Sequence, residues 1–180
     1  MTDKLQRTTG VLIVDDDLLA RRAIAEYLSL VSDFTVQGAA ATAEEALALV
    51  QDSPPDMVLL DVRMPGMDGI EACARIRQLA PDAIIIMMMS FDDEDLLRRA
   101  VAAGASGYLL KNVRAAQLIV ALRAARQGLP AMSPWALVGL AGVEEGVAEM
   151  IDLCADYRAH TTLFPRSSRF DGGTGPCRDL

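Results

Sequence analysis

The sequence predicts an α/β fold: a doubly wound parallel sheet of five strands with five helices, followed by an irregular or partly helical C-terminal tail. Over about the first 128 residues, short apolar runs alternate with segments of helical period, which is the pattern of βαβ units. Hydrophobic residues make up 52% of the 180 residues but aromatic residues only 4%, so aliphatic side chains and methionine must fill the core. This length suits one domain of ~100–150 residues and an appendage.

The predicted strands are short apolar runs, each bounded by turn or helix-start residues. They cover residues 11–14, 34–38, 57–60, 84–89 and 107–110. The fourth run is apolar from Ile84 to Met89, which is typical of a central strand that is covered on both faces.

The first two helices have clear apolar faces and ends. An apolar stripe at helical spacing follows the first strand and consists of Ala20, Ile24, Tyr27, Leu28 and Val31. The second helix begins with the capping box Thr42-Ala43-Glu44-Glu45, in which the Thr hydroxyl and the Glu carboxylate bind free backbone N–H groups. Pro54-Pro55 ends it.

The last three helices are predicted from their end signals. The third begins after Asp68-Gly69 and stops before Pro81, and the fourth covers about residues 93–103, with Gly104 as its C-terminal stop. Asn112 is the expected cap of the fifth helix. The buried stripe of that helix consists of Leu118, Ile119, Leu122 and Ala125.

The alternation ends near Gly128. The sequence therefore predicts a main domain over residues 9–128 and a linker over 129–142, where prolines interrupt any periodicity. Residues 143–180 form the predicted tail. Its apolar residues at helical spacing indicate one helix over about 143–157, although nearby glycines weaken the start of that helix. Residues beyond His160 are poor in core formers and are predicted to be disordered.

Charge and composition exclude several classes of function. The formal net charge is −8, and no face rich in Lys and Arg stands out, so direct binding of nucleic acid is not expected. No apolar run reaches the ~18–20 residues of a membrane span, which predicts a soluble protein without a membrane partner. The cysteines are odd in number and lack metal-ligand spacing, which favours reduced thiols and a cytoplasmic location; they are Cys73, Cys154 and Cys177.

Four charged residues follow the predicted strands. Asp15 and Asp16 come directly after the first strand, Asp61 after the third and Lys111 after the fifth. Parallel strands end at the same edge of a sheet, so three carboxylates should crowd into one pocket. Such a cluster requires shared protons or a hard cation such as Mg²⁺. Acids, a metal and an ammonium group at one edge indicate a phosphoryl site.

The segments around these residues carry a family resemblance. Residues 11–16, 60–69 and 103–111 read VLIVDD, LDVRMPGMDG and AGASGYLLK. Together they resemble the receiver domain of two-component response regulators of the NarL/FixJ subfamily, over about residues 9–134. The resemblance implies a flavodoxin-like sheet with the strand order 2-1-3-4-5.

The resemblance also implies a role for each charged residue. Asp61 matches the phosphoacceptor, which forms an acyl phosphate, and Lys111 matches the ammonium group that contacts a phosphoryl oxygen. Asp15, Asp16 and Asp61 match carboxylate ligands of Mg²⁺, and Arg63 matches a ligand through its backbone carbonyl. The implied partner is a sensor histidine kinase or a phosphotransfer protein, and a homodimer stays open.

The chain departs from the family in two places. Receivers place Thr or Ser at the end of the fourth strand, where the hydroxyl meets the phosphoryl group. Ungapped spacing from Lys111 puts Met89 there, and a one-residue slip would offer Ser90 instead. Tyr108 matches the aromatic residue that moves in the switch. The second departure is the tail: residues 130–180 carry seven acids and four arginines, net −3, and resemble no helix-turn-helix domain.

Two other functions remain open at this point. Met89 favours a pseudo-receiver, an interaction module that no longer switches. The acids also allow a phosphatase of the haloacid-dehalogenase type, with Asp15 as nucleophile and Asp17 as acid/base. That family resembles Asp-x-Asp-Gly-Thr, however, whereas Leu18-Leu19 follows here, and Asp61 and its loop would have no role. The receiver is the favoured function, and it is not a turnover enzyme.

Overall fold

A computed structural model describes residues 8–90, 93–129 and 131–132. The strands in these residues are β1 Thr9–Val14, β2 Phe34–Ala40, β3 Met57–Asp61, β4 Ile84–Met89, β5 Gly107–Leu110 and β6 Ala131–Met132. The helices there are α1 Leu18–Ser29, α2 Ala43–Asp52, α3 Gly69–Leu79, α4 Glu94–Ala102 and α5 Ala115–Arg126.

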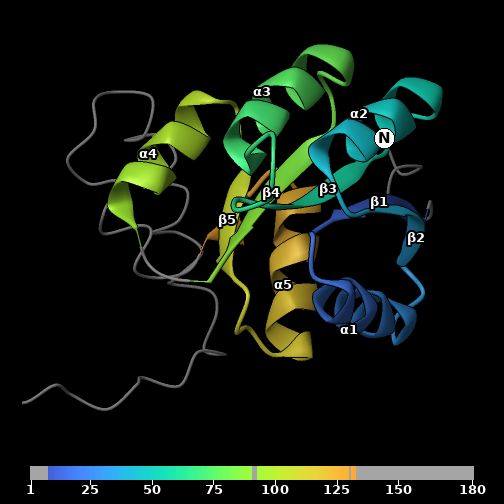
Figure 1. Ribbon diagram of the computed structural model, residues 1–180. Coiled ribbons are helices and arrows are strands. Elements are labelled where there is room, and N and C mark those ends of the chain that lie inside the picture. The colour runs from blue at the N-terminus through green and yellow to red at the C-terminus, as the bar shows by residue number, and fades with distance from the viewer. Residues whose placement is uncertain (1–7, 91–92, 130, 133–180) are drawn as a thin grey trace, which may run out of the picture.

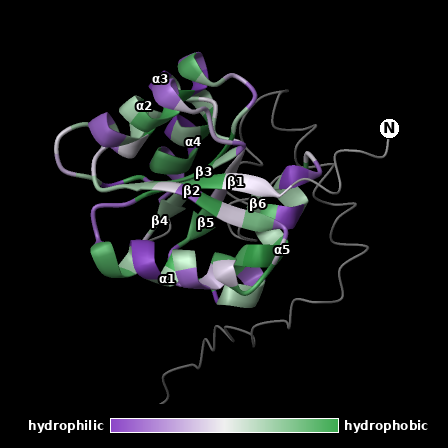
Figure 2. Cartoon of the chain, turned by 90° about the vertical axis from the view of Figure 1, so that its right-hand side faces the viewer, coloured by the Kyte–Doolittle hydropathy of each residue, from purple (hydrophilic) through white to green (hydrophobic). Residues whose placement is uncertain are grey.

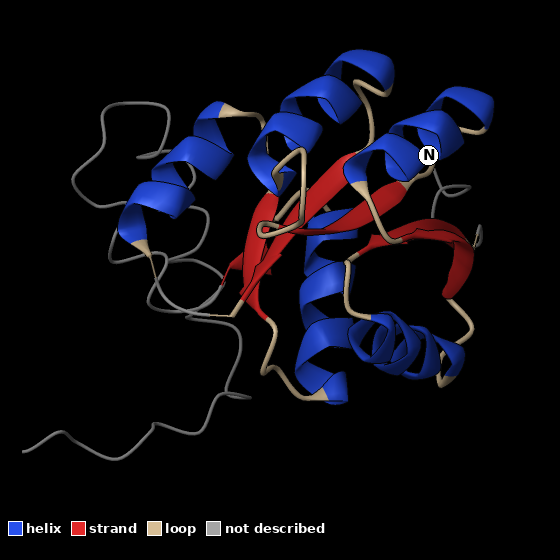
Figure 3. Ribbon diagram, in the orientation of Figure 1, coloured by secondary structure: helices blue, strands red, loops and turns tan. Residues whose placement is uncertain are grey.

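The helices cover both faces of one parallel sheet (Figures 1 and 3). α1 and α5 lie on one face, whereas α2, α3 and α4 lie on the other (Figure 1). The strand order is β2-β1-β3-β4-β5-β6 within the described residues. The predicted fold class and the order of the first five strands are therefore confirmed.

The sheet has one strand more than the five that were predicted. Ala131–Met132 pairs in parallel with β5, inside the segment that was predicted to be a linker. A strand of two residues has no period that a sequence pattern could reveal, so only the tertiary contact defines it. The rest of the predicted linker from residue 133, and the tail with its helix over 143–157, lie outside the described residues.

Side-chain caps begin several of the helices, and the predicted cap Thr42 is one of them. Thr42 accepts a hydrogen bond from the Glu45 N–H at 3.2 Å, and Asp68 caps α3 in the same way at 2.8 Å. The prediction that Asn112 caps α5 is wrong, because that helix begins two residues later, after Arg114. There the side-chain oxygen of Gln117 accepts a hydrogen bond from the Arg114 N–H at 3.1 Å, so the backbone N–H just before the helix has a partner.

Alternation along the strands divides the core between the two faces. On β4, Ile85, Met87 and Met89 pack in the cluster under α2, α3 and α4, which we call the α3 face. Ile86 and Met88 pack in the cluster under α1 and α5, which we call the α5 face. Helices such as α1 alternate hydrophobic and hydrophilic residues accordingly (Figure 2). None of the helices in the described part is long and apolar enough to cross a bilayer.

Candidate functional site

Three carboxylates meet where β1 and β3 end. These strands pair in register from Val11 opposite Met57 to Val14 opposite Leu60, so the next residues, Asp15 and Asp61, emerge side by side. One oxygen from each of Asp15, Asp16 and Asp61 lies within 4.8 Å of the others. Asp15 is 2% exposed and Asp61 4% exposed, whereas Asp16 is exposed to solvent. The pocket therefore holds two buried acids and one acid at its mouth.

Lys111 reaches this cluster from the end of β5. Its backbone N–H donates to the Met89 carbonyl at 2.7 Å, which ties the end of β5 to the end of β4. Its ammonium nitrogen lies 2.7 Å from Oδ2 of Asp15 and 2.7 Å from Oδ2 of Asp61. The structure thus brings together the four charged residues that the sequence placed at one sheet edge.

Burial and charge act against each other in this pocket. Burial raises the pKa of Asp61 above its ordinary value, although the hydrogen bond from Lys111 and the Arg63 N–H oppose the increase and the Asp15 charge adds to it. Burial alone would lower the pKa of Lys111, but its hydrogen bonds to Asp15 and Asp61 raise it overall. With three acids and one ammonium group, the cluster favours a further positive charge.

The loop after β3 holds Asp61 through backbone contacts. The Arg63 N–H donates to Oδ1 of Asp61 at 3.1 Å, and the Gly69 N–H donates to the Val62 carbonyl at 2.9 Å. A Cβ on Gly69 would lie 1.9 Å from the Asp61 carbonyl oxygen, so only glycine allows α3 to begin this close to the acid. The proposed metal contact of the Arg63 carbonyl stays a prediction.

The loop after β1 fixes Asp15 in a similar way. The Asp17 N–H donates to Oδ1 of Asp15 at 2.9 Å, while the Asp17 side chain accepts the Leu19 N–H at 2.8 Å and caps α1. Arg21 donates from its guanidinium to the Asp15 carbonyl oxygen. Arg21 was not predicted from the sequence, because a contact between a helical side chain and a backbone carbonyl six residues earlier produces no sequence motif.

The proposed switch residues lie beside this pocket. Met89 pairs with Leu110 at the end of the β4–β5 register, and its side chain is buried in the α3-face cluster together with Tyr108. Ser90 follows the strand and is exposed. The last residue of β4 is therefore the buried Met89, and the exposed hydroxyl of Ser90 comes one residue later.

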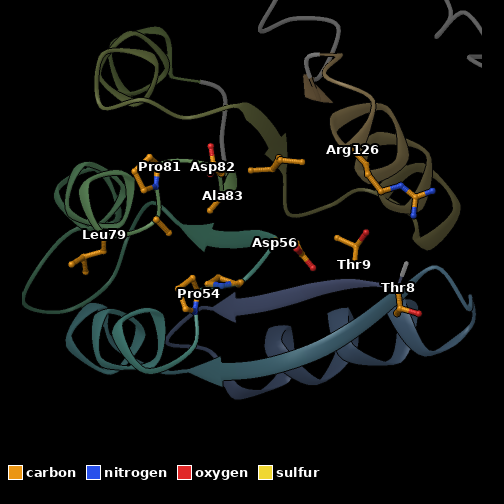
Figure 4. A pocket seen from close by; sticks show the side chains of 12 residues that line it. Thr8, Thr9, Pro54, Asp56, Leu79, Pro81, Asp82, Ala83 and Arg126 are labelled. Carbon is orange, nitrogen blue, oxygen red and sulfur yellow. The ribbon is translucent and has the colours of Figure 1, made fainter. Parts of the chain in front are cut away.

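The described residues also contain a cavity of about 730 Å³ at the end of the sheet where the strands begin (Figure 4). Thr9, Asp56 and Ile84, at or next to the starts of β1, β3 and β4, line it together with Arg126 at the end of α5. Asp56 accepts the Gly10 N–H there at 2.8 Å. The acid cluster and Lys111 lie at the other ends of these strands, so this cavity is separate from them.

Comparisons with known proteins agree with the geometry of the acid cluster. A family model described as the response regulator receiver domain matches residues 11–123. The response regulator protein VraR of Staphylococcus aureus is 34% identical over 156 residues, which are 87% of this chain and 75% of VraR.

Solved structures give the same relationship. The signal receiver domain of the putative response regulator NarL from Mycobacterium tuberculosis is 31% identical, with a TM-score of 0.65 over 68% of this chain and 98% of that one. A chain of the CheX-CheY-BeF3-Mg²⁺ complex from Borrelia burgdorferi is 27% identical, with a TM-score of 0.61 over 65% and 88% of the two chains.

Proposed function

This chain belongs to the family of response regulator receiver domains of two-component systems, and we propose that Asp61 is its phosphoacceptor. The observation that supports this most is the position of Lys111, whose ammonium nitrogen lies 2.7 Å from both buried carboxylates. A salt bridge that only stabilises the fold needs no more than one acid for one ammonium group. Two buried acids and a third at the pocket mouth, around one lysine, are suited to a metal and a phosphoryl group.

The acid cluster fits Mg²⁺. Mg²⁺ prefers six oxygen ligands and keeps several waters, so one or more oxygens from Asp15, Asp16 and Asp61 suit it and leave room for a phosphoryl oxygen. When bound, the cation would offset the negative charge of the cluster and of the incoming phosphoryl group. The similar complex from Borrelia burgdorferi, which contains BeF3 and Mg²⁺, supports this choice of metal.

The proposed reaction transfers one phosphoryl group from a phosphohistidine of a sensor kinase or phosphotransfer protein. An Asp61 carboxylate oxygen attacks the phosphorus; the new O–P bond forms as the P–N bond breaks, and the electron pair returns to the imidazole. Lys111 offsets charge on a phosphoryl oxygen, and the Arg63 N–H holds Oδ1 of Asp61 in place. Receiver domains are generally not turnover enzymes, and this chain is expected to hold the group as a signal.

The other two functions receive unequal support. Asp17 would be the acid/base of a haloacid-dehalogenase-type phosphatase, but it caps α1, and the family match is to receivers. The pseudo-receiver is supported by Met89, which is buried and which ungapped spacing from Lys111 places at the family's hydroxyl position. We propose that Met89 weakens the response to phosphorylation without preventing phosphorylation. The cytoplasmic location and the absence of direct DNA binding stay predictions.

Intact-mass spectrometry of the full chain tests the phosphoacceptor. With acetyl phosphate and Mg²⁺, the wild type should gain the mass of one phosphoryl group, and Asp61→Asn should gain none. Asp68→Asn is a matched control, because Asp68 lies in the same loop, and asparagine also caps helices. Full labelling of Asp61→Asn, or no labelling of the wild type, would remove the assignment.

A further inference from the structure

Arg21 binds the backbone beside the acid cluster. It lies in the first turn of α1 and is half-buried, and its guanidinium donates to the Asp15 carbonyl oxygen. A cation in the first turn of a helix faces the positive end of the helix dipole, which is unfavourable. The stability of α1 therefore does not explain an arginine at this position, whereas the contact with Asp15 does.

The carbonyl that Arg21 binds belongs to the peptide unit between Asp15 and Asp16. Because a peptide unit is planar, one hydrogen bond to its oxygen restrains the orientation of the whole unit. A rotation of this plane changes ψ of Asp15 and φ of Asp16 together, and with them the directions of both side chains. Arg21 thus acts on two of the three acids whose oxygens lie within 4.8 Å of one another.

Asp16 depends on the backbone for its position. Its side chain is exposed at the mouth of the pocket, unlike the buried Asp15. The peptide unit after it is held, because the Asp17 N–H donates to Oδ1 of Asp15 at 2.9 Å. The peptide unit before it is held by Arg21. One hydrogen bond on each side therefore fixes the backbone from which the Asp16 carboxylate reaches the cluster.

We propose that Arg21 is a positioning residue that aligns Asp15 and Asp16 for Mg²⁺ and so raises the affinity of the acid cluster for this cation. The proposal rests on the proposed function of the cluster. Mg²⁺ demands nearly octahedral geometry, so a small displacement of its carboxylate ligands lowers its affinity. Groups that hold the ligands of a metal from outside typically contribute roughly 10–100-fold in affinity. The positive charge of a guanidinium, by contrast, repels a cation, so geometry and charge predict opposite effects of removing Arg21.

Titration of Mg²⁺ into the full chain, followed by amide chemical shifts in NMR and without a phosphoryl donor, tests the proposal. Arg21→Met removes the donor and the charge and should weaken Mg²⁺ binding about tenfold. Arg22→Met is the matched control, because Arg22 is the next residue of α1 and is exposed, so that solvent and salt screen its charge. It should leave the affinity unchanged. Equal or tighter Mg²⁺ binding by Arg21→Met would overturn the proposal.

Labelling by acetyl phosphate separates positioning from a general loss of stability. In Arg21→Met the half-saturating Mg²⁺ concentration should rise about tenfold, whereas a merely less stable variant would be labelled less at every Mg²⁺ concentration with the same half-saturation. If Arg21→Met fails to fold, Arg21→Gln is measured in its place against the same criterion. Wild-type labelling that depends on Mg²⁺, with no change in the variant, would overturn only the role of Arg21. Absence of Mg²⁺ binding and labelling in the wild type would overturn the proposed function as well.

Discussion

Replacing Met89 by threonine should strengthen the response of this receiver to phosphorylation. Met89 is buried among Tyr108 and other residues of the α3-face cluster, so the shorter, polar side chain should cost about 2–4 kcal/mol of folding free energy. That cost is present with and without the phosphoryl group. A hydroxyl that donates to a phosphoryl oxygen contributes ~1.5–3 kcal/mol in the phosphorylated form alone. The balance between the two conformations should therefore shift roughly ten- to a hundredfold on phosphorylation.

Hydrogen exchange in β5, measured before and after acetyl phosphate treatment, provides the assay. Met88→Thr is the matched control, because Met88 and Met89 are both 3% exposed but Met88 packs in the α5-face cluster. It should lower stability by a similar amount and leave the response unchanged. Ser90→Ala should also leave the response unchanged. If Met89→Thr is silent while Ser90→Ala abolishes the response, the reasoning is refuted and Ser90 is the switch residue.

Two further predictions concern stability. Gly69→Ala should lower the free energy of unfolding by about 3 kcal/mol or more, because the alanine Cβ would overlap the Asp61 carbonyl. Urea unfolding measures the loss, and a loss no larger than that of Gly38→Ala, whose Cβ would meet the Leu12 side chain at 3.3 Å, would contradict the prediction. Arg123 donates to Asp33 at 2.8 and 3.0 Å and so holds the pKa of Asp33 below its ordinary value. This stabilisation is present above about pH 4 and lost as the pH falls through the lowered pKa. Asp33→Asn should therefore cost about 0.5–1 kcal/mol near pH 7 and progressively less as the pH falls below about 4, and an equal cost at every pH would count against the pair.

The strand ends were predictable because a parallel sheet converts sequence position into spatial position. Runs such as 11–14 and 57–60 are apolar, so both must be central strands, and the residues after them must share an edge. Asp15 and Asp61 follow directly, and the register of β1 and β3 places them side by side. Lys111 was predictable for the same reason.

Features that depend on one tertiary contact were not predictable. β6 has two residues and no period, and the Gly107 that admits it resembles any glycine at the start of a strand. Arg21 resembles a solvated helical arginine until α1 packs beside the first strand and the side chain reaches the Asp15 carbonyl. In both cases the residue type fits several environments, so the sequence alone does not select one.

Side-chain hydrogen bonds hold the start of β5. The Arg77 side chain donates to the Gly104 carbonyl at 2.8 Å and to Oγ of Ser106 at 3.1 Å, and Ser106 Oγ also accepts the Ile85 N–H at 3.2 Å. These bonds fasten the turn before β5 to α3 and β4. The other end of β5 is held as well, by the Lys111 N–H on the Met89 carbonyl at 2.7 Å and by the ammonium contacts to Asp15 and Asp61. β5 is therefore fastened at both ends, and this keeps the Lys111 ammonium group in place beside Asp15 and Asp61.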